Sequence, residues 1–158
     1  GMDVTITDKK SLLPLLNLNL KQNEDLLKQR RNGSEGWPKV VDLFWGTGNP
    51  FGHNFHTVLG SDLTYDMDIL PILLSTMVAL CTPVNEGEAA GEVILSYGKH
   101  RAAIPVFFEQ AAEYFELHHV PKENMPPIKE LLARGADFFF LKQISQPTGI
   151  VRMRLKQK

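Results

Sequence analysis

Hydrophobic and polar residues follow one another along this chain in short blocks that predict alternating strands and helices. Residues 4–7 are mostly β-branched, which is typical of a short strand, and this strand ends at Asp8. Leucines then recur at helical spacing between residues 9 and 31, so we expect a helix with one apolar stripe. Pro14 falls near the first turn of this helix, where proline is tolerated.

The middle of the chain predicts two further strands and a long helix. Residues 39–45 are largely apolar and follow a Gly-containing turn, which indicates a second strand. Residues 55–63 predict the central strand, and residues 66–80 predict a helix with Pro71 in an early turn. The same patterns predict strands at residues 92–97, 115–120 and 150–156, and helices at residues 103–115 and 127–134.

This order of elements predicts the fold class. Strands of buried and of alternating type, separated by helices, favour an α/β fold whose sheet is mostly parallel, with an antiparallel pair at the C-terminal end. A length of 158 residues fits one domain. Because Gly1 before Met2 is typical of a scar left by tag removal, we expect this single domain to cover residues 2–158.

Composition narrows the classes of partner. Charged residues make up 22% of the chain and the formal net charge is -1, so charge indicates neither a nucleic-acid nor a membrane partner. The sequence contains no apolar run long enough to span a bilayer. The one cysteine, Cys81, lies in an apolar helical pattern. We therefore expect a core thiol, no intrachain disulfide and a reducing, cytoplasmic environment.

Two predicted strands end in polar residues that could carry chemistry. A carboxylate such as Asp8, between a strand and a helix, can accept hydrogen bonds from ribose hydroxyls, although it could equally be an N-cap. Residues 58–65 end a strand in Gly-Ser-Asp, which would place Asp62 and Tyr65 on the ligand side of a sheet. The alternative is that Asp62 and Asp66 cap the next helix.

Other chemical signals are weaker. Residues 46–52 contain a Gly-x-Gly, but no helix opens directly after the glycines, so turn chemistry is the better interpretation than a phosphate loop. His118 and His119 are adjacent on a strand and point to opposite faces, so they cannot bind one metal ion together. His100 either lies on the surface or borders a ligand channel.

Three motifs, taken in order, resemble the family 16 methyltransferases, the seven-stranded group that includes many protein-lysine methyltransferases. Gly60-Ser61-Asp62-Leu63-Thr64-Tyr65 matches the family pattern Gly-Ala-Asp-x-x-Tyr, with Ser61 in the Ala place. Leu43-Phe44-Trp45-Gly46 is similar to the family's Leu-x-Trp-Gly segment. Residues 4–8 and the following Asn17-Leu18-Asn19 resemble the family's second strand and helix. The likeness covers nearly the whole chain.

The resemblance implies a Rossmann-like three-layer sandwich with a mostly parallel sheet and an antiparallel C-terminal strand. It also implies S-adenosylmethionine as cofactor, lysine of a protein substrate as acceptor, and no metal. Asp8 would hold the ribose hydroxyls, Trp45 would lie beside the adenine, and Ser61 would line the same pocket through its backbone. Asp62 and Tyr65 would face the acceptor amine.

The sequence departs from the family at its start, because the first strand and its Gly-rich loop would precede Val4. One hypothesis is a truncated methyltransferase that keeps half of the cofactor pocket. Another is a homodimer in which a second chain fills the exposed sheet edge. The competing functional class is a methyltransferase-like interaction domain without catalysis, and a nucleotide-binding α/β protein of another kind is a further alternative.

Overall fold

The structure is a computed structural model that describes residues 3–30, 36–121 and 148–156. The chain divides into two compact units, Gly1–Phe44 and Trp45–Lys158. The predicted helix at residues 127–134 lies outside the described residues. The expectation of one domain over residues 2–158 stays a prediction.

The first unit contains two parallel strands, one before and one after its helices, and both strands are rich in β-branched residues. Strand β1 is Thr5–Asp8 and strand β2 is Lys39–Asp42, with Ile6 opposite Val40 and Asp8 opposite Asp42. A short 3-10 helix, η1 (Lys10–Leu12), leads into helix α1 (Leu13–Gln22), and helix α2 (Glu24–Arg30) follows.

The single helix predicted for residues 9–31 is therefore wrong, because the helix breaks at Asn23. The side-chain amide of Asn23 donates to the carbonyl oxygen of Asn19 at 2.8 Å, beside the backbone hydrogen bonds that end α1. The backbone of Asn23 has a φ of -103° and a ψ of 13°, outside the helical region, so the helical ladder stops there. The periodic leucine pattern continues across the break, so hydrophobic spacing alone could not reveal it.

The leucine stripe of this unit is only partly covered. Among the described residues of the unit, Leu43 is the one buried hydrophobic side chain, at 7% exposure. Leu15 and Leu18 on α1 remain 53% and 49% exposed, and Leu26 on α2 is 49% exposed. The first unit thus presents an apolar helical surface.

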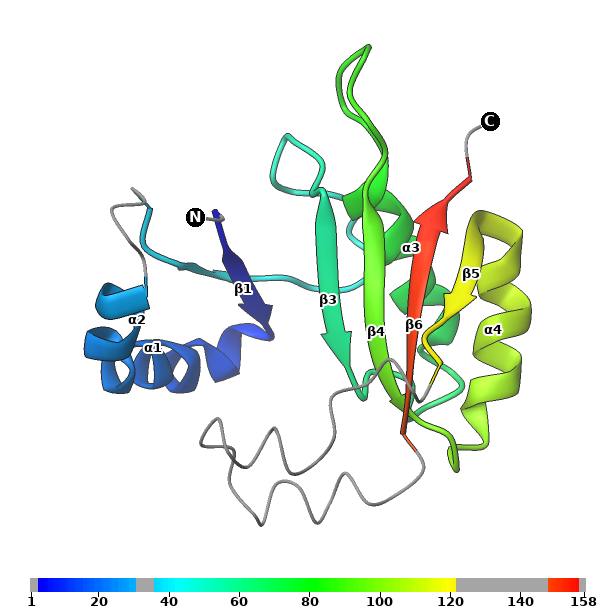
Figure 1. The fold of residues 1–158 in the computed structure, drawn as a ribbon, viewed down its shortest axis with the longest axis horizontal. Coiled ribbons are helices and arrows are strands. Elements are labelled where there is room, and N and C mark those ends of the chain that lie inside the picture. The colour runs from blue at the N-terminus through cyan, green and yellow to red at the C-terminus, as the bar shows by residue number, and fades with distance from the viewer. Residues whose placement is uncertain (1–2, 31–35, 122–147, 157–158) are drawn as a thin grey trace. The chain divides into compact units, whose positions relative to one another are not determined.

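The second unit contains a four-stranded sheet in the order β3-β4-β6-β5. These strands are β3 (Thr57–Ser61), β4 (Glu92–Gly98), β5 (Phe115–His119) and β6 (Thr148–Leu155). Strands β3 and β4 are parallel, and β6 runs antiparallel to both of its neighbours. The predicted α/β fold, with an antiparallel C-terminal strand in an otherwise parallel sheet, is confirmed (Figure 1).

Helices α3 (Leu70–Cys81) and α4 (Ala103–Tyr114) pack on one face of this sheet. Alternate residues of β4 supply the sheet side of the core, and Val93 and Leu95 are fully buried. Phe107 of α4 faces them from the helical layer and is also fully buried. Cys81 is buried as predicted, and this burial, with a smaller effect of Glu92, raises the pKa of its thiol to about 12.

The other face of the sheet carries a charged cluster. Glu92 of β4 accepts hydrogen bonds from Nε and Nη2 of Arg152 at 2.5 and 2.6 Å, and Nε of Arg154 lies 3.7 Å away. The hydrogen bonds from Arg152 hold the pKa of Glu92 below its usual value. This pair connects β4 to β6 across the sheet.

Strand β3 forms the edge of the sheet in the described part of the chain, where it pairs with β4 alone. On either side of β3, the backbone N–H of Asp62 donates to the carbonyl oxygen of Ser96, and the carbonyl oxygen of His56 accepts from the N–H of Glu92. Because every second residue of a parallel strand bonds to the same neighbour, the even-numbered residues from 56 to 62 turn their backbone groups toward β4. Leu59 falls between them, its backbone groups face the free edge, and its side chain is 76% exposed.

We expect Glu92→Gln to lower the melting temperature by about 2 °C near neutral pH. A carboxylate with a depressed folded-state pKa contributes stability above its unfolded pKa and loses it as the pH falls through the folded value. The deficit of the variant should therefore close in acid, as thermal unfolding followed by circular dichroism from pH 7 to pH 3 would measure. Glu113→Gln, which removes an exposed carboxylate of α4, is the control and should leave the melting temperature unchanged at every pH. A deficit that stays constant with pH would contradict the assignment.

Candidate functional site

The candidate site lies where β3 and β4 end side by side. Ser61 is the last residue of β3 and stands opposite Ser96 of β4. Asp62 follows with a φ of 52°, in the left-handed region, and its backbone N–H donates to the carbonyl oxygen of Ser96 at 2.9 Å. Aspartate tolerates this conformation better than most residues. The chain thus turns sharply at Asp62 while it remains attached to β4.

Asp62 forms a two-pronged ion pair with Arg101, from the loop between β4 and α4. Nε of Arg101 donates to Oδ1 at 3.0 Å, and Nη2 donates to Oδ2 at 2.5 Å. The side chains are partly open to solvent, with 34% exposure for Arg101 and 54% for Asp62. Parallel neighbouring strands bring their carboxyl ends to the same edge, which explains how the two loops meet.

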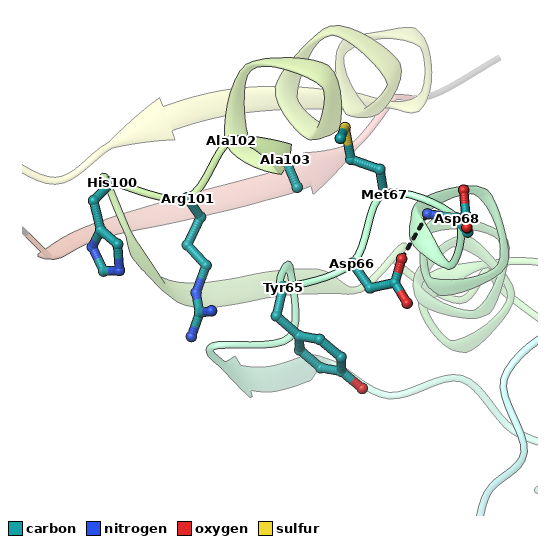
Figure 2. Close-up of a pocket in the computed structure, with 8 residues that line it drawn as sticks. All are labelled: Tyr65, Asp66, Met67, Asp68, His100, Arg101, Ala102 and Ala103. Carbon is teal, nitrogen blue, oxygen red and sulfur yellow. Dashed lines mark hydrogen bonds between the residues drawn. The ribbon is translucent and has the colours of Figure 1, made fainter.

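An open cavity of about 670 Å³ adjoins this pair. It is lined by residues 65–68, between β3 and α3, and by residues 100–103, between β4 and α4. Figure 2 shows the side chains of Tyr65, Asp66, His100 and Arg101 around it. Tyr65 is 54% exposed, so its ring is accessible to a ligand. Tyr65 and Arg101 therefore meet at one cavity.

The helix-capping alternative for Asp62 and Asp66 is wrong. Oδ1 of Asp66 accepts from the backbone N–H of Asp68 at 3.0 Å, which makes a local turn (Figure 2). Helix α3 begins later, at Leu70, with no side-chain cap and with proline in its first turn. Asp62 instead uses both carboxylate oxygens for Arg101.

Thr64 anchors the loop that carries these residues. Its side chain is fully buried, and its hydroxyl oxygen has no hydrogen-bond partner among the described residues. This buried side chain fixes the loop between Asp62 and Tyr65 to the core, and the sequence pattern gave no sign of it beyond its place in the motif.

Trp45 begins the second unit and packs, half-buried, against its core. The neighbouring Gly46 has a φ of 89°, and its N–H donates to Oγ1 of Thr76 on α3 at 2.8 Å. A Cβ at Gly46 would lie 2.9 Å from a methyl carbon of Ile72. Residues 46–52 contain turns and no helix, which confirms the interpretation as turn chemistry.

Asp8 lies in the first unit, and Trp45 and Ser61 belong to the second. It is half-buried at the end of β1, and its Oδ1 accepts from the N–H of Lys9 at 2.7 Å. Neither η1 nor α1 has a side-chain cap, so the N-cap alternative for Asp8 is wrong.

The two adjacent histidines point to opposite faces, as predicted. Nδ1 of His119 lies 3.1 Å from the hydroxyl of Tyr97, and Nε2 of His118 lies 3.9 Å from a carboxylate oxygen of Glu116. Over residues 3–30, 36–121 and 148–156 there is no group of three or more His, Cys, Asp or Glu side chains that could hold a metal ion. Within the same ranges, no helix has the length and hydropathy needed to cross a membrane.

Comparison with known proteins yields one family and one fold. A family model described as "Lysine methyltransferase" matches residues 1–114. No curated protein matches the sequence. The crystal structure of a predicted O-methyltransferase from Agrobacterium tumefaciens is similar, with a TM-score of 0.58 and 10% identity. The match covers 99% of this chain and 64% of that one, so the chain spans less than two thirds of its length. At this identity the likeness shows the fold, which is Rossmann-like.

Gly46→Ala should destabilise the protein more than Gly48→Ala does. Both glycines have a positive φ, so alanine costs about 1 kcal/mol at each. The new Cβ at position 46 would also crowd Ile72, whereas the one at position 48 meets nothing within 4 Å. We expect an additional loss of about 1 kcal/mol at position 46 in urea denaturation. Equal losses would show that Ile72 does not restrict the side chain at position 46.

Proposed function

This chain belongs to the lysine methyltransferase family, and from that premise we propose that it transfers a methyl group from S-adenosylmethionine to a lysine of a protein substrate. The observation that carries the proposal is the arrangement of Asp62 and Tyr65 at the carboxyl end of β3. The carboxyl ends of strands are where α/β sheets bind ligands. Tyr65 lines a cavity there, and Asp62 is paired with another residue of the same cavity, Arg101.

The residues expected to bind the cofactor have suitable chemistry. Asp8 presents a half-buried carboxylate at a strand end, which can accept hydrogen bonds from ribose hydroxyls. The half-buried indole of Trp45 offers an aromatic face for a purine, and Ser61 offers backbone groups at the end of β3. When bound, S-adenosylmethionine would supply a methyl group activated by a sulfonium.

The acceptor residues would act on the amine. A primary amine must reach the methyl carbon with its lone pair free, so its orientation matters more than its tight binding. Asp62 can accept an N–H of the amine and so direct its lone pair. The exposed ring of Tyr65 can hold the alkyl stem and any positive charge that develops on nitrogen.

We further propose a cytoplasmic location. Cys81 is the single cysteine of the chain and is buried in α3. A free core thiol is typical of proteins that function in a reducing compartment.

The second candidate function is an interaction domain without catalysis, which forms a homodimer. Two observations favour it: the edge of β3 is unpaired within the described residues, and Leu59 on that strand is 76% exposed. An unpaired edge strand offers backbone hydrogen bonds to another strand. In this alternative the edge of β3 would pair with the same edge of a second copy.

Isothermal titration with S-adenosylhomocysteine tests the enzyme proposal. We expect stoichiometric binding with a micromolar dissociation constant. Asp8→Ala should weaken it about tenfold, because a carboxylate that bonds two hydroxyls is lost. Asp42→Ala, which removes a carboxylate at the end of the neighbouring strand β2, should have little effect. If the unmodified chain gives no heat, the interaction-domain alternative gains support.

Analytical ultracentrifugation tests the homodimer. We expect the chain to sediment as a dimer at high concentration, and Leu59→Lys to shift it toward monomer by adding charge at the edge strand. Tyr114→Lys replaces an exposed aromatic residue at the end of α4, which leads into β5 at the opposite edge of the sheet, and should leave the dimer intact. A monomer at every concentration would rule this pairing out.

A further inference from the structure

We propose that Arg101 sets the charge of the acceptor site, by occupying Asp62 so that the site favours a neutral amine over an ammonium ion. The inference deepens the function proposed above and rests on its assignment of Asp62 to the acceptor. It concerns a residue that the family motif does not contain, since Arg101 comes from the loop before α4. Arg101 would be a positioning residue, which acts through Asp62.

Backbone hydrogen bonds position both members of the ion pair between Asp62 and Arg101. Asp62 is fixed by its left-handed backbone and by its N–H, which donates to Ser96. The backbone N–H of Arg101 donates to Gly98 at 3.1 Å, and its carbonyl oxygen accepts from Ile104 of α4 at the same distance. Two parallel hydrogen bonds then join the guanidinium to the carboxylate. Both backbones are therefore positioned before a ligand arrives.

The charges of the two groups offset each other. A guanidinium stays protonated at all accessible pH values, so Arg101 is a permanent cation beside Asp62. An approaching ammonium ion is attracted by the carboxylate and repelled by Arg101 at a similar distance. A neutral amine meets no such repulsion, and it can still donate one N–H to a remaining lone pair of Asp62.

This selection suits methyl transfer because the neutral amine has the lone pair that forms the new bond. An unpaired carboxylate would hold lysine as ammonium, which has no lone pair to donate. Arg101 would thus reduce binding of the unreactive form without removing the hydrogen-bond acceptor that orients the reactive one.

Other charged and titratable groups also face this cavity. Asp66 and Asp68 lie on the loop before α3, Tyr65 precedes them, and His100 lies next to Arg101. The two carboxylates can attract cations toward the cavity mouth. They are unchanged when Arg101 is replaced, so a comparison between variants at position 101 isolates the effect on Asp62.

An NMR titration with n-butylamine, a mimic of the lysine side chain, tests the inference on the full chain. At pH 7 this probe is an ammonium ion. We expect the Arg101→Gln variant to bind this ammonium ion about fivefold more tightly than the wild type does, because no guanidinium then offsets the negative charge of Asp62. Arg101→Lys keeps the cation and should stay within about twofold of the wild type. n-Butanol, which is neutral and of similar shape, should not distinguish the variants.

The double variant Asp62→Asn/Arg101→Gln identifies the carboxylate responsible and should lose the gain in affinity. The inference is overturned if Arg101→Gln binds the ammonium no more tightly than the wild type, or if the double variant keeps the gain. A gain of binding cannot arise from unfolding. Titration with S-adenosylhomocysteine does not depend on Asp62, so failure of the methyl-transfer proposal is seen separately.

Discussion

The burial of alternate side chains of β4 is the constraint on which the second unit depends. Val93, Leu95 and Tyr97 lie between the sheet and the two helices, and burying an aliphatic side chain such as that of Val93 or Leu95 contributes about 1.5–3 kcal/mol. By contrast, an exposed ion pair such as that of Asp62 and Arg101 contributes about 0–1 kcal/mol. The core therefore fixes the positions of the loops, and the loops bring their charged residues together as a result.

Much of this architecture could be predicted from periodicity. The alternating residues of β4 and the helical spacing of α3 reflect a single buried face, so the pattern and the packing carry the same information. The break at Asn23 could not be predicted in this way, because it falls at a polar position and leaves the spacing of the leucines unchanged. The polar pattern around the break is compatible with either a continuous or a divided helix.

The candidate site shows the same division between local and non-local information. Asp62 and Tyr65 could be proposed because they follow a strand within a recognisable motif. Arg101 could not be assigned, since it lies 39 residues further along the chain. Its meeting with Asp62 depends on the register of β3 and β4, in which Ser61 stands opposite Ser96. Nothing local to Gly98-Lys99-His100-Arg101 distinguishes the arginine that pairs from the lysine two residues before it.

The residue type at position 62 is not the one that backbone stability favours. At a φ of 52° glycine would be unstrained, whereas a residue with a Cβ costs about 1 kcal/mol, somewhat less for aspartate. The exposed ion pair with Arg101 returns about that amount at most. Stability therefore gives no net reason for a carboxylate here, although glycine occupies positive-φ positions such as Gly46 and Gly48 elsewhere in this unit. A carboxylate kept at a strained turn, beside a cavity at the end of a parallel strand, agrees with the ligand-binding role proposed for it.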